Sequence, residues 1–256
     1  MAKKDVEILE KQANSLAASG NYLGAGTTLS VIAELNPSDS QRWTQAAEWL
    51  AQGGAADKAV RVLQTGVRLN EKNVETRHRL MQALAEHHLG MQRWVEATEV
   101  SRQLLRENPR HHGGLELLAT ALLQTNNLPE AVQAIQALLR LSPRDPLHRL
   151  KLATLYQLQG RLGDAMHEFQ RVLDTQGGFP FTHDALEAIE SLDRLQTQQI
   201  LMMATERGAF RLKLERDFDN ALFENGFQLS EFARESLRNM VADLTPADRP
   251  APPRTH

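Results

Sequence analysis

Two pairs of adjacent histidines are the side chains in this sequence that could bind a transition metal. They are His87 with His88, and His111 with His112. A zinc site needs about four ligands in a tetrahedral arrangement. The first pair is predicted near the end of one helix, and the second follows a return helix of about 15 residues, or ~20 Å. Neither pair has a carboxylate at obvious ligand spacing. We therefore expect no metal site and no cofactor.

No residue pattern typical of a catalytic site occurs. The 256 residues include no cysteine, which removes thiolate nucleophiles, thiolate metal sites and disulfides together. The sequence has no G-x-x-x-x-G-K-[ST], G-x-S-x-G, H-E-x-x-H or G-x-G-x-x-G motif. Serine, histidine and acidic residues are present, but no spacing pairs them. We expect a protein that is not an enzyme, with no catalytic residues.

Charge and hydropathy exclude further classes of partner. The 29 basic and 32 acidic residues are mixed along the chain and leave a net charge of −3. Nucleic-acid binding is therefore not expected, since it requires a basic surface. The start, MAKKDVEILEKQ, lacks the apolar core of a signal peptide. No run of about 18 apolar residues occurs. These features favour a cytoplasmic protein without membrane insertion.

The sequence repeats itself with a period near 34 residues. Short segments that end in alanine recur with spacings of 34, 38, 34 and 34, at Ala25, Ala59, Ala97, Ala131 and Ala165. Twelve residues later come the predicted helix stops Pro37, Glu71, Pro109, Pro143 and Gly177. Turn-forming residues precede four of the alanines by five positions: Gly20, Gly54, Asn126 and Gly160. Each unit is predicted to be helix, tight turn, helix.

This pattern resembles the tetratricopeptide repeat family, whose 34-residue unit carries W-x2-L-G-x2-Y, then A-x3-F, then P. The fifth unit matches best, through Leu152, Ala153, Tyr156, Ala165 and Phe169. Small residues are expected where paired helices approach closely, at Ala47, Ala59, Ala119, Ala131, Ala153 and Ala165. The predicted fold class is all-α, a right-handed α-solenoid of about five helix hairpins over residues 6–178.

The third unit is four residues longer than the others. Four residues rotate a helix by about 400°, so side chains return to nearly the same face. The insertion, within residues 74–92, is predicted to lengthen the first helix of that hairpin by one turn. We expect a protrusion beside HHLGMQRW.

The resemblance implies that the first helix of each unit lines a concave peptide-binding groove. Its positions correspond here to Glu10, Asn14, Thr44, Glu48, Gln82, Glu86, Glu116, Thr120, Leu147, Leu150, Gln157 and Leu158. Glu10 stands where family members that bind a carboxylate have their first lysine, so that activity is not expected. An acidic groove favours a basic or amide-rich peptide. Alternatively, the glutamates are a solvated face and the leucines are covered by the chain's own next helices.

The 34-residue period stops near Phe179. A helix is predicted from Thr182 or His183, with a break within residues 194–198. It would cover the fifth unit through Ala185, Ile189, Leu192 and Leu195. Asp217 is expected to cap a short helix that Gly226 ends, and Ser230 to cap a helix reaching Leu244. The predicted domains are residues 6–178, residues 179–244 and a disordered proline-rich tail over residues 245–256.

Seven of the eight phenylalanines lie at or beyond Phe179. A partner-binding module is predicted at Phe210, Arg211, Phe218, Leu222, Phe223 and Phe227. Phe210, Arg211, Leu214, Asp217, Ala221, Leu222, Gly226 and Leu229 also resemble the signature of nitrile-hydratase-like leader peptides. That resemblance implies that a modifying enzyme recognises residues 209–244. Alternatively, these phenylalanines fold back onto Leu147, Leu150 and Leu158 as a cap.

Two functions are therefore predicted. The first is a non-catalytic adaptor or assembly scaffold that binds a protein or peptide in the repeat groove, whose acidic residues favour a basic partner. The second is a client or partner of a modifying enzyme that recognises the C-terminal module. The sequence leaves the partner's identity and a homo-oligomeric state open.

Overall fold

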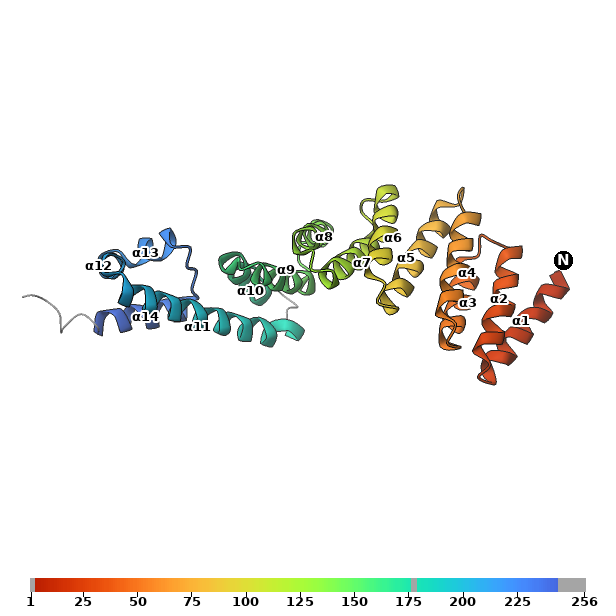
Figure 1. Ribbon diagram of the computed structural model, residues 1–256, viewed down its shortest axis with the longest axis horizontal. Helices are drawn as coiled ribbons and strands as arrows, with labels where there is room; N and C mark the ends of the chain where they lie inside the picture. Colours follow the sequence, from red (N-terminus) through yellow and green to blue (C-terminus); the bar gives the residue numbers. More distant parts are fainter. Residues whose placement is uncertain (1–2, 176–178, 244–256) are drawn as a thin grey trace, which may run out of the picture. The chain divides into compact units, whose positions relative to one another are not determined.

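The computed structural model describes residues 3–175 and 179–243. Every regular element within these ranges is a helix (Figure 1). The predicted fold class, an all-α, right-handed α-solenoid of helix hairpins with a C-terminal helical module, is confirmed. The chain divides into two compact units, Met1–Leu141 and Ser142–His256. The division into domains at residues 6–178, 179–244 and 245–256 remains a prediction. Gly177 and residues 245–256 lie outside the described residues.

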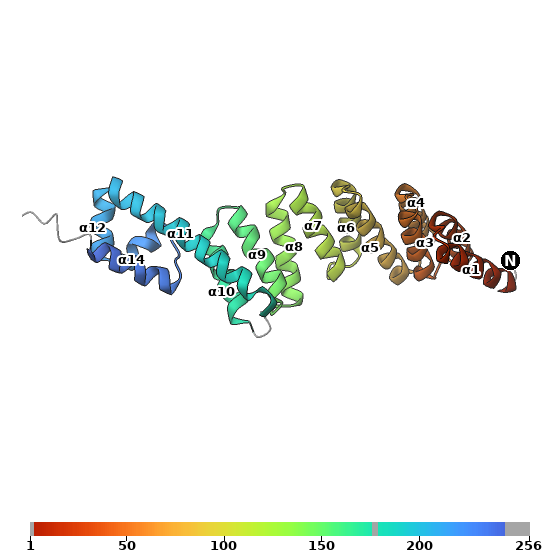
Figure 2. The same cartoon turned by 90° about the horizontal axis from the view of Figure 1, so that it is seen from below.

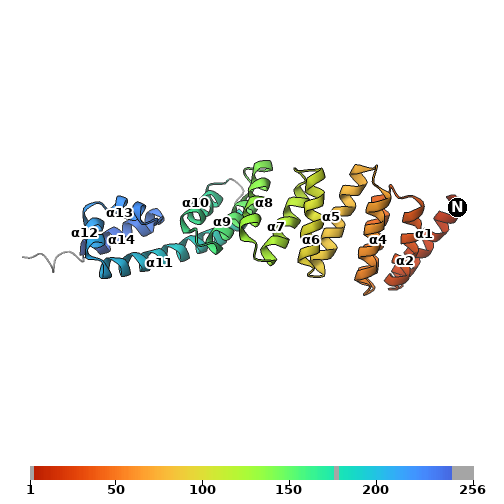
Figure 3. The ribbon, with the colours of Figure 1, turned by 45° about the horizontal axis from the view of Figure 1, so that its top comes forward.

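Four helix hairpins form the first unit, and each helix packs against the next one in the chain (Figure 3). The helices are α1 (Lys3–Ala18), α2 (Tyr22–Leu35), α3 (Ser40–Gln52), α4 (Ala56–Leu69), α5 (Val74–Gly90), α6 (Trp94–Glu107), α7 (His112–Gln124) and α8 (Leu128–Leu141). The second helix of each hairpin ends two residues before its predicted stop, at Pro37, Glu71, Pro109 and Pro143. The period of the alanines therefore locates the hairpins correctly.

A residue with positive φ lies in the turn of each hairpin. The φ angles are +81° at Gly20, +78° at Gly54, 57° at Gln92, 56° at Asn126 and +72° at Gly160. Glycine and asparagine adopt this conformation at low cost. The third turn uses a glutamine, which sequence reasoning did not identify because glutamine is not a usual turn former.

Small residues allow the helices to approach closely, as predicted. The six alanines expected at these contacts are all buried: Ala47, Ala59, Ala119, Ala131, Ala153 and Ala165. Gly26 of α2 marks a close approach to α3. A Cβ atom there would lie 2.8 Å from both the carbonyl oxygen of Ala46 and the amide nitrogen of Leu50. Since these atoms belong to the backbone, a side chain at Gly26 would force α2 and α3 apart.

The third hairpin confirms the predicted insertion. Helix α5 has 17 residues, whereas α3, α7 and α9 have 13 each. The difference equals about one turn of α-helix. The residues of this extra turn, rather than forming only a protrusion, line a hollow beside α3.

The second unit joins the fifth hairpin to the C-terminal helices (Figure 2). Its elements are α9 (Pro146–Leu158), α10 (Leu162–Asp174), a 3-10 turn at Phe179–Phe181, α11 (Thr182–Glu206), α12 (Gly208–Arg216), α13 (Phe218–Glu224) and α14 (Glu231–Asp243). Helix α11 packs on α10. Its Ala185, Ile189 and Leu192 are buried as predicted, but the prediction for Leu195 was wrong, since 45% of that residue is exposed.

The predicted break within residues 194–198 was also wrong. Helix α11 runs without interruption through 25 residues. No glycine or proline occurs within its bounds. Two polar residues in this part of the helix are buried, since Asp193 and Gln196 are only 8% and 1% exposed. The starting residue, Thr182, was predicted correctly.

Asp193 and Gln196 bind the segment that leads into α14. The Gln196 side chain donates to the carbonyl oxygen of Gln228 at 2.7 Å and accepts from its amide at 2.8 Å. Asp193 accepts from the amide of Ser230 at 2.8 Å and from its hydroxyl at 2.5 Å. Ser230 in turn accepts from the amide of Ala233 at 3.2 Å, which confirms it as the cap of α14. These bonds fix the path of the chain between α13 and α14.

The other predicted caps of the module are confirmed. The carboxylate of Asp217 accepts from the amide of Asn220 at the start of α13. Gly226, with φ +73°, follows the end of that helix.

We predict that Gly26→Ala destabilises the first unit. Alanine gains about 1 kcal/mol in helix propensity over glycine. Overpacking costs about 1–3 kcal/mol, and here the contacts are with backbone atoms. Urea unfolding followed by circular dichroism measures the balance. Gly90→Ala is the matched control, because a Cβ there meets nothing within 4 Å. Equal stabilisation by both substitutions would refute the close approach.

We also predict that Gln196→Ala loosens the segment before α14. It removes both partners of the Gln228 backbone, and an unsatisfied buried polar group costs about 1–3 kcal/mol. Hydrogen exchange in residues 227–241 should accelerate by roughly 5- to 150-fold. Gln198→Ala, at an exposed position of the same helix, is the control. Unchanged exchange in Gln196→Ala would contradict the role of these hydrogen bonds.

Candidate peptide-binding pocket

None of the twelve predicted groove residues is buried. They lie on the first helix of each hairpin, as expected. Glu10 and Asn14 are on α1, Thr44 and Glu48 on α3, Gln82 and Glu86 on α5, Glu116 and Thr120 on α7, and Leu147, Leu150, Gln157 and Leu158 on α9. The four residues of α9 belong to the second unit and the other eight to the first. Their binding role stays a prediction.

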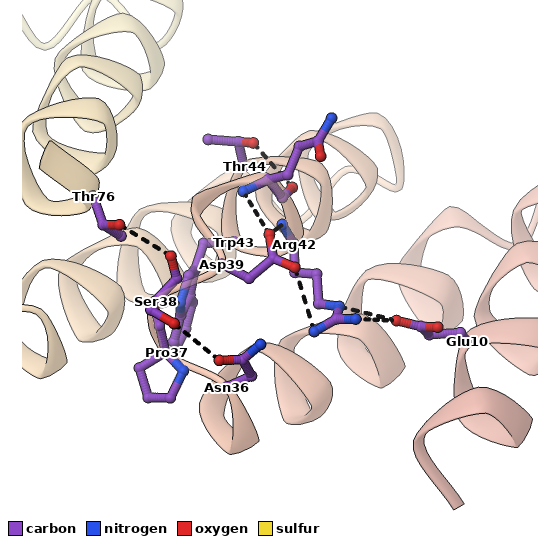
Figure 4. A network of polar contacts seen from close by, with 10 residues as sticks. Glu10, Asn36, Pro37, Ser38, Asp39, Arg42, Trp43, Thr44 and Thr76 are labelled. Atoms are coloured by element: carbon purple, nitrogen blue, oxygen red, sulfur yellow. Dashed lines mark hydrogen bonds and ion pairs between the residues drawn. The ribbon is translucent and has the colours of Figure 1, made fainter. Parts of the chain in front are cut away.

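At the N-terminal end, the charge of Glu10 is compensated. Its Oε1 atom lies 2.7 Å from Nη2 of Arg42 and accepts from Nε of the same guanidinium at 2.9 Å (Figure 4). Arg42 is also 3.3 Å from Asp39. Glu10 and Asn14 line a polar hollow next to α3, together with Trp49. The N-terminal end is therefore less acidic than its sequence indicates.

The loop between α2 and α3 binds residues of α3, of the end of α4 and of α5. Figure 4 shows Trp43 of α3 and Thr76 of α5 beside this loop. The carbonyl oxygen of Pro37 accepts from the indole of Trp43 at 3.0 Å and from the side-chain amide of Asn70 at 2.7 Å. The carbonyl oxygen of Ser38 accepts from the hydroxyl of Thr76 at 3.0 Å. Trp43 begins the buried face of α3, Asn70 caps the C-terminus of α4 and Thr76 lies in the first turn of α5. These bonds help to hold α3 and α5 at a fixed separation.

A hollow of about 690 Å³ lies between α3 and α5, and we call it the α3–α5 pocket. It brings together four predicted groove residues, Thr44, Glu48, Gln82 and Glu86. Its other lining residues are Ala51, Ala56, Arg79, Ala83, His87, Gly90 and Met91. Sequence reasoning placed Arg79 on the concave face, but it did not assign the other six to the groove. The signal that could have found the last three is the 38-residue spacing, which adds a turn to α5.

Two carboxylates line the pocket without a basic side chain to balance them. Glu48 accepts from the side-chain amide of Gln45 at 3.1 Å, and Glu86 accepts from that of Gln82 at 2.9 Å. Arg79 is the basic residue of the lining, and it pairs with Glu75 at 2.7 Å. Across the described part of the chain, neither Glu48 nor Glu86 forms an ion pair with lysine or arginine. The pocket therefore favours a cation.

His87 contributes an imidazole to the same pocket. Burial lowers its pKa below the ordinary value of 6.5, while Glu48 and Glu86 act in the opposite direction. The ring is therefore mostly neutral at pH 7, and it does not offset the two carboxylates.

The two histidine pairs lie at opposite ends of their helices, as predicted. His87 and His88 are in the last turn of α5, whereas His111 and His112 are at the start of α7. One part of the reasoning was wrong. The ring nitrogen of His112 lies 3.5 Å from the carboxylate of Glu116, four residues later. His111 instead caps α7 by accepting from the amide of Gly114 at 3.1 Å.

Phe210 and Phe218 do not cap α9, because the core that they join contains no residue of that helix. Phe210, Phe218 and Leu222 pack into a small core of their own, with Leu214, Leu229, Leu237 and other residues of α11 to α14. Phe227 packs at the edge of this core, whereas Phe223 and Arg211 are exposed. Burial gives most of this predicted partner-binding set a structural role. Binding by the module and its leader-peptide resemblance stay predictions.

Comparison with known proteins agrees with this architecture. Residues 82–146 match the family model described as tetratricopeptide repeat. Solved structures of MamA are similar in fold. The RS-1 ArsTM double mutant of MamA has 18% identity and a TM-score of 0.54, over 68% of this chain and 96% of that one. A MamA structure from residue 41 to the end, from Desulfovibrio magneticus RS-1, has 18% identity and a TM-score of 0.53, with the same coverage.

A further MamA crystal structure has 13% identity and a TM-score of 0.55, over 68% of this chain and 93% of that one. No curated protein sequence matches the chain. Fold and repeat period together define an α-solenoid protein of the kind that binds other proteins. Residues 82–146 are tetratricopeptide-repeat sequence, and the chain has the fold of a tetratricopeptide-repeat solenoid. Among residues 3–175 and 179–243, no helix has the length and apolarity needed to cross a membrane.

We predict that the pKa of His87, measured by NMR titration in the intact protein, lies below 6.5 because burial disfavours the protonated ring. The carboxylates of Glu48 and Glu86 offset part of that decrease. The double variant Glu48→Gln, Glu86→Gln should lower the pKa further, because both carboxylates favour the protonated ring. Glu75→Gln is the control, since Glu75 pairs with Arg79 and is not among the pocket's lining residues. A pKa unchanged by the double substitution would show that the carboxylates do not face the ring.

Proposed function

We propose that this protein is a non-catalytic adaptor or assembly scaffold that holds a cationic side chain of a partner peptide in the α3–α5 pocket. The observation that carries the proposal is the pair Glu48 and Glu86, two carboxylates that line one hollow and bind only neutral amides. A guanidinium or ammonium group would form charge-assisted hydrogen bonds with them.

The rest of the lining suits the other parts of an arginine or lysine residue. Ala51, Ala83 and Met91 offer apolar surface for the aliphatic stem of the side chain. The hydroxyl of Thr44 donates to the carbonyl oxygen of Gln41, and the amide of Gln82 donates to Glu86. The oxygen atoms of both side chains can still accept hydrogen bonds from a peptide backbone. A cation therefore enters the pocket with both its charge and its stem accommodated.

The acidic residues at the N-terminal end of the groove are less available to a cation than those of the α3–α5 pocket. Glu10 is already paired with Arg42, so a basic partner would have to displace a guanidinium there. Glu48 and Glu86 require no such displacement. We therefore assign the principal cation site to the α3–α5 pocket and not to the α1 end of the groove.

The experiment is a binding titration of the full-length protein with fluorescein-labelled peptides. One peptide, (Gly-Ser-Arg)4, carries arginines, and its control replaces each arginine with neutral citrulline. The arginine peptide should bind at least about tenfold more tightly, since charge-assisted hydrogen bonds contribute about 1.5–3 kcal/mol each. Glu48→Gln with Glu86→Gln should remove that preference and leave helicity unchanged, because both residues are exposed.

Glu34→Gln with Glu71→Gln is the control variant, with the same change in net charge at two exposed residues outside the pocket. It should retain the preference. Equal binding of both peptides by the natural sequence would contradict the cation site. Equal losses in the pocket and control variants would show that net charge alone attracts the peptide.

A further inference from the structure

A phenylalanine in the second unit is exposed without an evident structural need. Phe232, in the first turn of α14, has 84% of its surface accessible, more than any other large apolar residue of the described chain. Phe223 on α13 is comparable at 81%. The two differ in surroundings, because Phe232 lines a hollow and Phe223 does not line it.

The hollow is a groove between α11 and α14 with a volume of about 460 Å³. On α11 its wall is a helical stripe that includes Arg194, Thr197 and Leu201. On α14 its wall includes Phe232, Ala233 and Leu237. One surface therefore offers both a protruding aromatic ring and a groove of suitable size. A surface of that kind is complementary to a second copy of itself.

Charges beside the groove fit the same arrangement. Arg194 lines the groove on α11 and forms no ion pair with any residue the structure describes. Glu235 follows Phe232 by three positions on α14, so it lies on a nearby part of that helix. It is exposed and likewise forms no ion pair within the described ranges. By contrast, Arg234 and Arg238 contact Asp219 of the same chain at 3.6 Å and 3.0 Å.

We propose that two copies of this chain associate through the α11–α14 groove, with Phe232 of each copy entering the groove of the other. Glu235 of each copy then pairs with Arg194 of the other, and two-fold symmetry makes this contact twice. This arrangement covers the exposed ring of Phe232 and the α11–α14 groove in both copies. It uses residues of the second unit and does not depend on the α3–α5 pocket.

The expected association is weak. Helix α14 has 13 residues, so its contact strip is about 20 Å long and ~10 Å wide. That is smaller than the roughly 800 Å² per partner of a stable complex. We therefore expect a monomer–dimer equilibrium in the micromolar range, which concentration controls.

Sedimentation equilibrium of the full-length protein, from about 5 to 300 µM, tests the proposal. The natural sequence should dimerise within this range. Phe232→Glu should raise the dimer dissociation constant at least about tenfold. Phe223→Glu, an equally exposed phenylalanine outside the groove, should change it by less than about twofold. Both positions are exposed, so neither variant disturbs the core.

Charge reversal tests the contact itself. Arg194→Glu and Glu235→Arg should each weaken the dimer about fivefold or more, and the double variant should restore it to within about twofold. A monomer at every concentration overturns the proposal, and so does a dimer unaffected by Phe232→Glu. Dimerisation that appears only after residues 245–256 are deleted also overturns it, because the chain's own C-terminal segment would then be the occupant.

Discussion

The close approach of paired helices is the constraint on which the rest of this structure depends. Buried alanines recur at the period of the repeat, and Gly26 brings α2 so near to α3 that a single Cβ would meet backbone atoms. Helices packed this tightly bury one face and leave the other face of the first helix in each hairpin open. The α3–α5 pocket lies on such an open face. Its polar residues are therefore available to a ligand, because the packing of the repeat does not require them.

A four-residue insertion changes the surface without changing this packing. Four residues amount to about one helical turn, so Leu80 and Leu84 of α5 remain on the buried face. The added length brings Gly90 and Met91 to the pocket beside Glu86 and His87. An insertion of two or three residues would have rotated the helix and exposed core side chains. An insertion of about one helical turn therefore preserves the packing of the repeat and also extends the wall of the α3–α5 pocket.

The sequence predicts those features that depend on local spacing. Alanine contacts, four of the five turn residues, the longer α5 and the caps at Asp217 and Ser230 were found in this way. Features that depend on distant side chains were not. Nothing in the spacing indicated that Arg42 would pair with Glu10, or that Asp193 and Gln196 would be buried to bind the backbone 32 to 37 residues later. Partners that lie this far along the chain leave no signal in the local spacing of the sequence.

The central claim is that the α3–α5 pocket binds a cationic side chain, and methyl NMR tests it most directly. Met91, which directly follows α5, lines the pocket, whereas Met81 within α5 is buried at 1% exposure and serves as the internal reference. In full-length protein labelled at its methionine methyl groups, titration with the (Gly-Ser-Arg)4 peptide should shift the Met91 resonance and leave Met81 nearly unchanged. The citrulline peptide should shift neither. A titration in which other methionines respond and Met91 does not would contradict the account.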